Sequence, residues 1–140
     1  MAATSDMMKA VGFRPSSQTL AVEYVTVPKP GPKQILVKVQ TVALNSVDGM
    51  NVDHPIALQD MRVVGTDFAG VVERIGEDLE SLEDPRVKIG ARVAGLVQGA
   101  NSANDRPGAY AEYVVADYDL TWKVGVQDMN GNATERISWP

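Results

Sequence analysis

The chain has 140 residues, of which 44% are hydrophobic and 22% charged, so it can bury a core and fits neither a disordered nor a fibrous class. Cysteine is absent, which excludes disulfides and thiolate-bound metals, and no apolar stretch reaches the roughly 18 residues that span a bilayer. The net charge of −5 supplies no basic field for nucleic acid, and no N-terminal signal pattern is visible. These features favour a cytoplasmic protein that binds neither nucleic acid nor membrane.

In chain order, the sequence predicts short strands separated by Gly and Pro. In Gln34–Val42 the pattern partly alternates apolar with polar residues, which is typical of a strand with one buried face. Only Ser46–Asn51 and Ile56–Met61 are candidates for short helical turns. The acidic run 77–84 is interpreted as a solvated connection between strands. The strand candidates are Met8–Gly12, Leu20–Val27, Gln34–Val42, Phe68–Ile75, Arg92–Val97, Ala109–Ala116 and Leu120–Val124.

This spacing predicts one small β-barrel or sandwich over residues 1–124, which would be a single domain. Residues 125–140 have little periodicity and are interpreted as a divergent, disordered tail. We hypothesise that the tail comes from a translated intron or a frameshift, which would make the chain a truncated product.

Three blocks combine strand-like runs with regularly placed glycines: residues 30–39 with 43–48, 65–76 with 88–93, and 99–101 with 108–115. Together they resemble the N-terminal domain of the zinc-independent medium-chain dehydrogenase/reductase superfamily, which includes quinone oxidoreductases. The third block is most similar to fungal trans-acting enoyl reductases, which serve polyketide synthases. The resemblance covers about residues 8–124. It implies a mainly β fold with short helices, a GroES-like partly open β-barrel, without the Rossmann cofactor domain.

The resemblance also bears on zinc. Zinc-dependent members use a cysteine and a histidine that align with Asn45 and Thr66 of this sequence, followed by an acidic residue, here Asp67. Because Asn and Thr are poor zinc ligands beside thiolate and imidazole, the sequence predicts no metal site. The single histidine, His54, lies in a polar segment and is interpreted as a surface residue.

Zinc-independent relatives reduce an activated carbon–carbon double bond with a hydride from NADP(H). The resemblance places Asn45, Ser46, Val47 and Asp48 beside the cofactor, and Gly65, Thr66 and Asp67 in the substrate cleft.

Structural roles for several of these residues stay open. Asn45 or Ser46 could cap a short helix, with Asp48 in its first turn. Gly65 could be a turn glycine, and Asp67 could be a buried, hydrogen-bonded carboxylate. Tyr110 could donate a proton or belong to the core, so the catalytic residues are left unassigned.

No Gly-x-Gly-x-x-Gly turn for a dinucleotide occurs in the sequence, so no turnover is expected from the chain alone. Three interpretations remain. The chain belongs to an NADP(H)-dependent enoyl reductase that acts on a small enoyl substrate, with a polyketide synthase or acyl-carrier protein as partner. Alternatively, it is a stand-alone GroES-like binding module without catalysis, or a non-functional remnant. The enzymatic interpretation depends on the resemblance.

Overall fold

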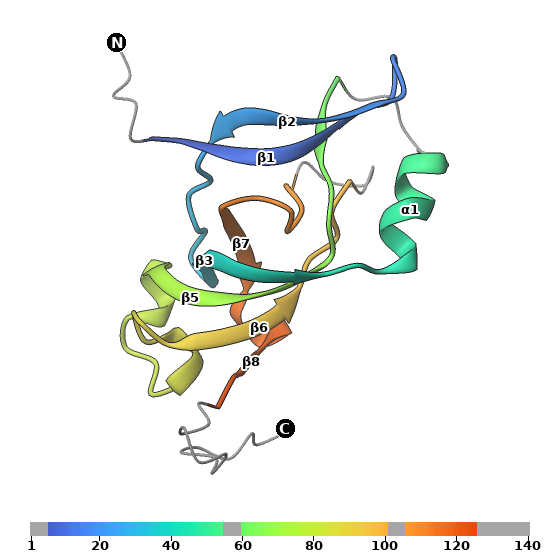
Figure 1. Ribbon diagram of the computed structural model, residues 1–140. Coiled ribbons are helices and arrows are strands. Elements are labelled where there is room, and N and C mark those ends of the chain that lie inside the picture. The colour runs from blue at the N-terminus through green and yellow to red at the C-terminus, as the bar shows by residue number, and fades with distance from the viewer. Residues whose placement is uncertain (1–5, 55–59, 101–105, 126–140) are drawn as a thin grey trace.

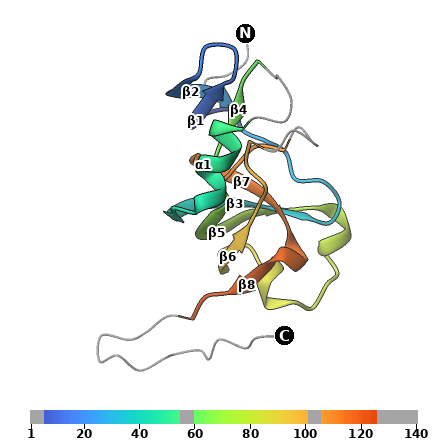
Figure 2. The same cartoon turned by 90° about the vertical axis from the view of Figure 1, so that its right-hand side faces the viewer.

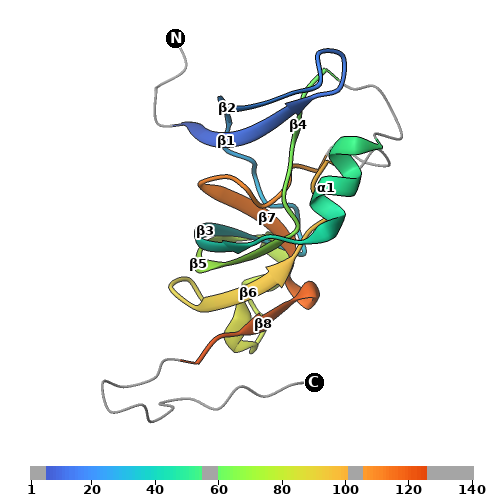
Figure 3. The same ribbon diagram turned by 45° about the vertical axis from the view of Figure 1, so that its right-hand side comes forward.

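The computed structural model describes residues 6–54, 60–100 and 106–125, which form two antiparallel sheets. The smaller sheet has the strand order β2-β1-β4, and the larger has the order β7-β3-β5-β6-β8. Figure 1 and Figure 3 show the smaller sheet above the larger one, with helix α1 at one end of β3. The strands are β1 (Met7–Arg14), β2 (Thr19–Thr26), β3 (Gln34–Ala43), β4 (Arg62–Val63), β5 (Asp67–Ile75), β6 (Arg92–Leu96), β7 (Tyr113–Asp117) and β8 (Thr121–Lys123).

The main core lies against the larger sheet. Along β5, Phe68, Gly70 and Val72 are buried while Ala69 and Val71 between them are only partly buried, which is the period of two along a strand. In the first half of β3, by contrast, three consecutive residues are buried, so both faces of that stretch are covered. The buried side chains of this core are Ile35, Val37, Phe68, Val72, Leu79, Val87, Val93, Val97, Ala109, Val114 and Ala116.

One short segment joins the two sheets. The backbone N–H of Val11 donates to the carbonyl of Tyr110 at 2.8 Å, and the N–H of Glu112 donates to the carbonyl of Lys9 at 3.0 Å, so residues 110–112 pair with β1. The carbonyl of Glu112 also accepts from the N–H of Val39, at 2.9 Å, in β3. The sheets are therefore connected but remain open, and they do not close into one barrel.

The helices are short. The α-helix α1 spans Ser46–Asp53, and three 3-10 helices span Glu77–Leu79 (η2), Pro85–Val87 (η3) and Tyr118–Leu120 (η4). In Figure 2, α1 lies at a level between the two sheets. None of the helices in the described ranges has the length and apolar character that crossing a membrane would need.

The prediction of a mainly β fold with short helices is confirmed, and each predicted strand is present with shifted ends. The largest shift is in Ala109–Ala116, because only Tyr113–Asp117 forms β7 while the residues before it turn toward β1. Strand β4 was not predicted. The acidic run connects β5 with β6 as expected, and Leu79 within it is buried.

Two predictions fall on residues outside the described ranges. For the helical turn expected at Ile56–Met61, the described residues Asp60 and Met61 are not helical, and 56–59 are not described. The tail expected at 125–140 is described only at Gly125.

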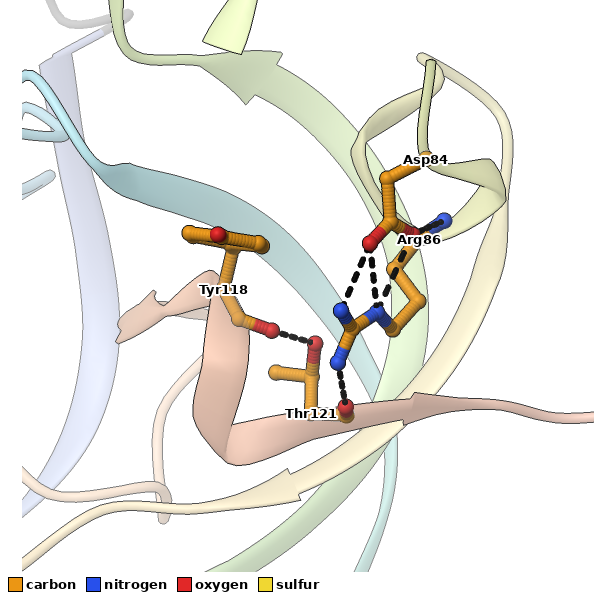
Figure 4. A network of polar contacts seen from close by, with 4 residues as sticks. All are labelled: Asp84, Arg86, Tyr118 and Thr121. Atoms are coloured by element: carbon orange, nitrogen blue, oxygen red, sulfur yellow. Dashed lines mark hydrogen bonds and ion pairs between the residues drawn. The ribbon is translucent and has the colours of Figure 1, made fainter. Parts of the chain in front are cut away.

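A polar network attaches the last strand to the loop before β6 (Figure 4). The guanidinium of Arg86 donates to Asp84 through Nε at 3.0 Å and Nη2 at 2.6 Å, and through Nη1 to the carbonyl of Thr121 at 3.0 Å. It also lies 5.4 Å from the centre of the Tyr118 ring. Because a planar guanidinium can make all these contacts at once, one side chain links η3, η4 and β8.

Candidate functional site

The candidate site begins at the N-terminus of α1. The Oδ1 atom of Asn45 accepts from the N–H of Val47 at 3.2 Å, and the carboxylate of Asp48 accepts from the N–H of Asn45 at 3.0 Å. This reciprocal arrangement is a capping box, which satisfies two backbone donors that a helix start leaves without partners. The capping role considered for Asn45 and Asp48 is therefore confirmed.

Asp48 is the buried centre of the site, with only 9% of its surface exposed. Its Oδ1 atom accepts from the hydroxyl of Thr66 at 2.5 Å, and its Oδ2 atom accepts from the hydroxyl of Tyr110 at 2.7 Å as well as from Asn45. Three donors compensate for removing the carboxylate from water. The site thus joins the start of α1, the residue before β5 and the segment that links the sheets.

Tyr110 packs against the smaller core, which is one of the two roles left open for it. Its ring packs partly buried beside Phe13, Val64 and Ala100, and its hydroxyl lies within 3.0 Å of the carbonyl of Ala43 in addition to Asp48. Partial burial and the hydrogen bond to Asp48 raise the pKa of Tyr110 from 10.0 to about 12. Because losing the proton would place a phenolate beside a carboxylate, this hydroxyl is suited to hold Asp48 and poorly suited to release a proton.

Gly65 leaves the space that the Tyr110 ring occupies. It has φ of +100°, which favours glycine, and a side chain at this position would collide with the Tyr110 ring. Gly65 can therefore be a turn glycine and also lie beside the predicted substrate cleft, because the two roles do not exclude each other.

The two residues that align with zinc ligands of zinc-dependent relatives make other contacts in this structure. The amide nitrogen of Asn45 donates to the carboxylate of Asp67 at 3.0 Å, while the hydroxyl of Thr66 is directed to Asp48. Asp67 accepts this hydrogen bond as its structural interpretation expected, but it is half-buried and not buried. Among the described residues there is no group of three or more His, Asp or Glu side chains that could hold a metal ion. The absence of zinc remains a prediction.

The remaining predicted residues lie around this network. Ser46 is exposed in the first turn of α1 and Val47 is half-buried. His54 is the exposed residue that ends the helix, as expected of a surface histidine. The seven predicted site residues thus come together in one region, together with Tyr110, which the sequence did not assign to the site.

The geometry permits only part of the predicted contact with NADP(H). Asn45 and Ser46 are exposed and carry an amide and a hydroxyl, which are the groups that bind ribose hydroxyls or a carboxamide. Asp48 is buried and already accepts three hydrogen bonds, so it fits a supporting position behind them. The two carboxylates nearby disfavour phosphate, which indicates that only the uncharged nicotinamide-ribose end would fit here.

The chain is similar in sequence or in fold to several oxidoreductases. A trans-enoyl reductase from Penicillium crustosum is 40% identical over 101 residues, which cover 71% of this chain and 26% of the relative. The quinone oxidoreductase from Coxiella burnetii matches with a TM-score of 0.63 and 26% identity, covering 84% of this chain and 37% of that one. The mycobacterial protein Rv1454c, solved in complex with NADPH, matches with a TM-score of 0.64 and 26% identity, covering 84% and 34%.

The chain therefore spans about a quarter of the length of the fungal relative. Residues 31–126 match the family model of the alcohol dehydrogenase GroES-like domain, which confirms the fold predicted from the three sequence blocks. On these grounds the chain belongs to the alcohol dehydrogenase GroES-like domain family of oxidoreductases, together with fungal trans-enoyl reductases.

Proposed function

We propose that this chain forms the N-terminal part of an NADPH-dependent enoyl reductase that reduces carbon–carbon double bonds of polyketide intermediates. The observation that carries the proposal is the exposed pair Asn45 and Ser46 at the start of α1, supported from behind by buried Asp48. Similarity to trans-enoyl reductases and to a protein solved with NADPH supports NADPH as the cofactor and an enoyl group as the substrate in this proposal.

In this function NADPH supplies a hydride to one carbon of the double bond, while a proton is added to the other. The chain's own contribution is placement. Ser46 and Asn45 would bind the nicotinamide-ribose end, and Gly65, Thr66 and Asp67 would form the adjoining wall of the substrate cleft. The capping box fixes the backbone of Asn45, so its side-chain amide is already held in place before the cofactor binds.

Three wider features belong to the same proposal. The partner would be a polyketide synthase or its acyl-carrier protein, which presents the enoyl group as a thioester. The domain would extend over residues 1–124, and the protein would act in the cytoplasm without zinc. Because the 140 residues carry no Gly-x-Gly-x-x-Gly turn, the chain alone is expected to bind NADPH weakly and to turn over no substrate.

The test joins residues 1–124 to the C-terminal part of the Penicillium crustosum relative and follows NADPH consumption with a crotonyl thioester. We expect turnover from the chimera and none from the 140-residue chain. In the chimera, Ser46→Ala should raise the KM for NADPH several-fold, because a hydrogen bond to a ribose hydroxyl is lost. Ser81→Ala is the matched control, since Ser81 is an exposed serine in the loop after η2.

A folded chimera that binds NADPH but leaves the thioester unchanged would contradict the proposal. Retention of an acyl-carrier protein by the 140-residue chain, with no turnover by the chimera, would instead favour the binding-module alternative. Stoichiometric zinc in protein prepared in metal-free buffer would overturn the zinc-independent part.

A further inference from the structure

An open groove lies where the two sheets separate. Strand β3 pairs with β7 as far as Lys38 opposite Tyr113, and the last backbone contact on this side is from the N–H of Val39 to the carbonyl of Glu112. Beyond that point the chain at 110–111 pairs with β1, while β3 continues to Ala43 against β5 alone. The second half of β3 is thereby left with an open side that faces the linking segment.

A break in register shapes the wall of this groove. The pairing of β3 with β5 shifts between Val39 and Thr41, so Gln40 is an extra residue in β3. Such bulges bend a strand and redirect its side chains, and they are frequent beside binding sites.

The groove has a volume of about 430 Å³ and is largely open to solvent. Two of its described lining residues, Gln40 and Thr41, are polar and uncharged, and none is Asp, Glu, Lys or Arg. The other lining residues are Val11, Val39, Val42, Leu44, Tyr110 and Ala111.

This groove is continuous with the candidate site. Leu44 immediately precedes the helix cap Asn45 and is 90% exposed. Tyr110 lines the groove and also donates its hydroxyl to Asp48. The groove and the cofactor-facing end of α1 therefore share a boundary, and a molecule in the groove would have one end at the site.

We propose that the groove binds the aliphatic chain of an acyl thioester, and that its apolar length sets which acyl chains the enzyme prefers. This inference rests on the proposed function, because the reacting double bond would lie at the Asn45 end. The lining favours an uncharged alkyl chain, since a charged group there would lose water without gaining a charged partner. Leu44 and Val42, exposed to 90% and 40%, would gain the most from being covered.

The test is calorimetric titration of the 140-residue chain with saturated acyl thioesters of N-acetylcysteamine of increasing chain length, without NADPH. Saturated thioesters cannot be reduced, so the titration measures binding alone. A fully buried methylene strengthens binding by a factor of about four, and one on a groove open to solvent by less. We expect about twofold tighter binding per added methylene until the chain outgrows the groove.

Two variants locate this binding. Leu44→Lys changes a side chain that is almost entirely exposed, so the fold should survive, and Val42→Lys places an ammonium group farther along the groove. Both should abolish the dependence on chain length. Ile89→Lys is the matched control, because Ile89 is 70% exposed in the turn before β6 and lies outside the groove. Backbone amide resonances near Val39 and Ala111 should shift with a long-chain thioester.

Affinity that does not change with chain length, or that Leu44→Lys and Val42→Lys both leave intact, would overturn the groove assignment. The result is separable from the proposed function. If the chimera turns over substrate but thioester affinity does not depend on chain length, the proposed reductase function is supported and the groove assignment is wrong. If affinity depends on chain length but the chimera shows no turnover, the groove assignment is supported and the proposed reductase function is wrong.

Discussion

Asp48 is held from three directions, and this decides what its side chain can do. Both carboxylate oxygens accept hydrogen bonds from groups of the protein, namely Asn45, Thr66 and Tyr110. Burial and these three hydrogen bonds leave the carboxylate little surface for contact with a ribose hydroxyl. Asp48 is therefore best described as a positioning residue that fixes the start of α1. In the proposed function, Asn45 and Ser46 would make the outer contacts.

Replacing Asp48 with Asn should destabilise the protein. The new amide keeps one acceptor oxygen but turns a nitrogen donor toward a group that is itself a donor, which leaves at least one buried donor without a partner. We expect Asp48→Asn to lower the free energy of unfolding by about 2 kcal/mol in urea denaturation. Asp53→Asn, at the exposed end of the same helix, is the control and should change stability by less than about 0.5 kcal/mol. Equal effects of the two variants would remove the positioning role.

The raised pKa of Tyr110 predicts that the stability of the fold depends on pH in the alkaline range. Its pKa is raised from 10.0 to about 12, so the folded protein holds this proton more tightly than the unfolded chain does. The stability it contributes is fully present below pH 10 and is lost as the pH rises toward about 12. Tyr110→Phe should therefore be less stable than the wild type below pH 10, by about 1 kcal/mol, with the difference shrinking above it.

Urea denaturation at several alkaline pH values measures this difference. Tyr24→Phe is the control, because Tyr24 is 69% exposed on β2, and its difference from the wild type should stay near zero. A gap between Tyr110→Phe and the wild type that stays constant from pH 9 to 12 would show that the hydroxyl does not couple stability to pH.

At the scale of elements, hydrophobic period predicts strands but not their partners. Strands β3 and β5 were predictable because their alternating or continuously buried residues give a strong local pattern. Strand β4 has two residues and no period, and it exists because Gly12 and Phe13 of β1 pair with it. The run Ala109–Ala116 was predicted as one strand, since no local signal shows that its first residues pair with β1 and the rest with β3.

A side chain outside the larger sheet, that of Arg86, contacts the start of strand β8. Arg86 bonds Asp84 and the Thr121 carbonyl, and it lies over the ring of Tyr118 (Figure 4). Arg86→Ala should lower the free energy of unfolding by about 1 to 2 kcal/mol, because charge-assisted and partly buried hydrogen bonds are lost together. Amide protons of β8 should also exchange faster with solvent.

Lys88→Ala is the control for this element. Lys88 lies in the same loop, and its ion pair with Glu83 has a separation of 3.9 Å at an exposed site, so its loss should change stability by less than about 0.5 kcal/mol. If amide exchange in β8 is equally slow in Arg86→Ala and in the wild type, the link between η3 and β8 has no role in holding the strand.

Across the whole molecule, the candidate site is assembled from stretches far apart in the sequence. The predicted residues 45–48 and 65–67 were found through resemblance, and the fold brings them together around Asp48. Tyr110 is 62 positions away from Asp48, and only the crossing of the linking segment between the sheets brings its hydroxyl to the carboxylate. Local patterns carry no information on such a contact, so the chemical use of Tyr110 stayed open until the topology was known.

Acid stability concerns the whole molecule, because three carboxylates with lowered pKa lie in different parts of the fold. The hydrogen bond from Arg14 lowers the pKa of Glu23 across β1 and β2, and that from Arg86 lowers the pKa of Asp84 beside β8. For Asp117, partial burial raises the pKa, but hydrogen bonds from Gln34 and Arg106 outweigh it and leave the pKa lowered.

A carboxylate with a lowered pKa stabilises the fold above its unfolded value and loses that effect as the pH falls through its folded value. We therefore expect the urea midpoint to stay nearly level from neutral pH toward the unfolded values of 4.5 for Glu23 and 3.8 for Asp84, and to fall below them. Arg86→Ala should be less stable at neutral pH yet lose less stability in acid, because Asp84 then titrates closer to its ordinary pKa. Parallel pH profiles for the variant and the wild type would mean that the Asp84–Arg86 pair does not contribute to acid unfolding. Converging profiles would identify this pair as one of the connections that acid breaks.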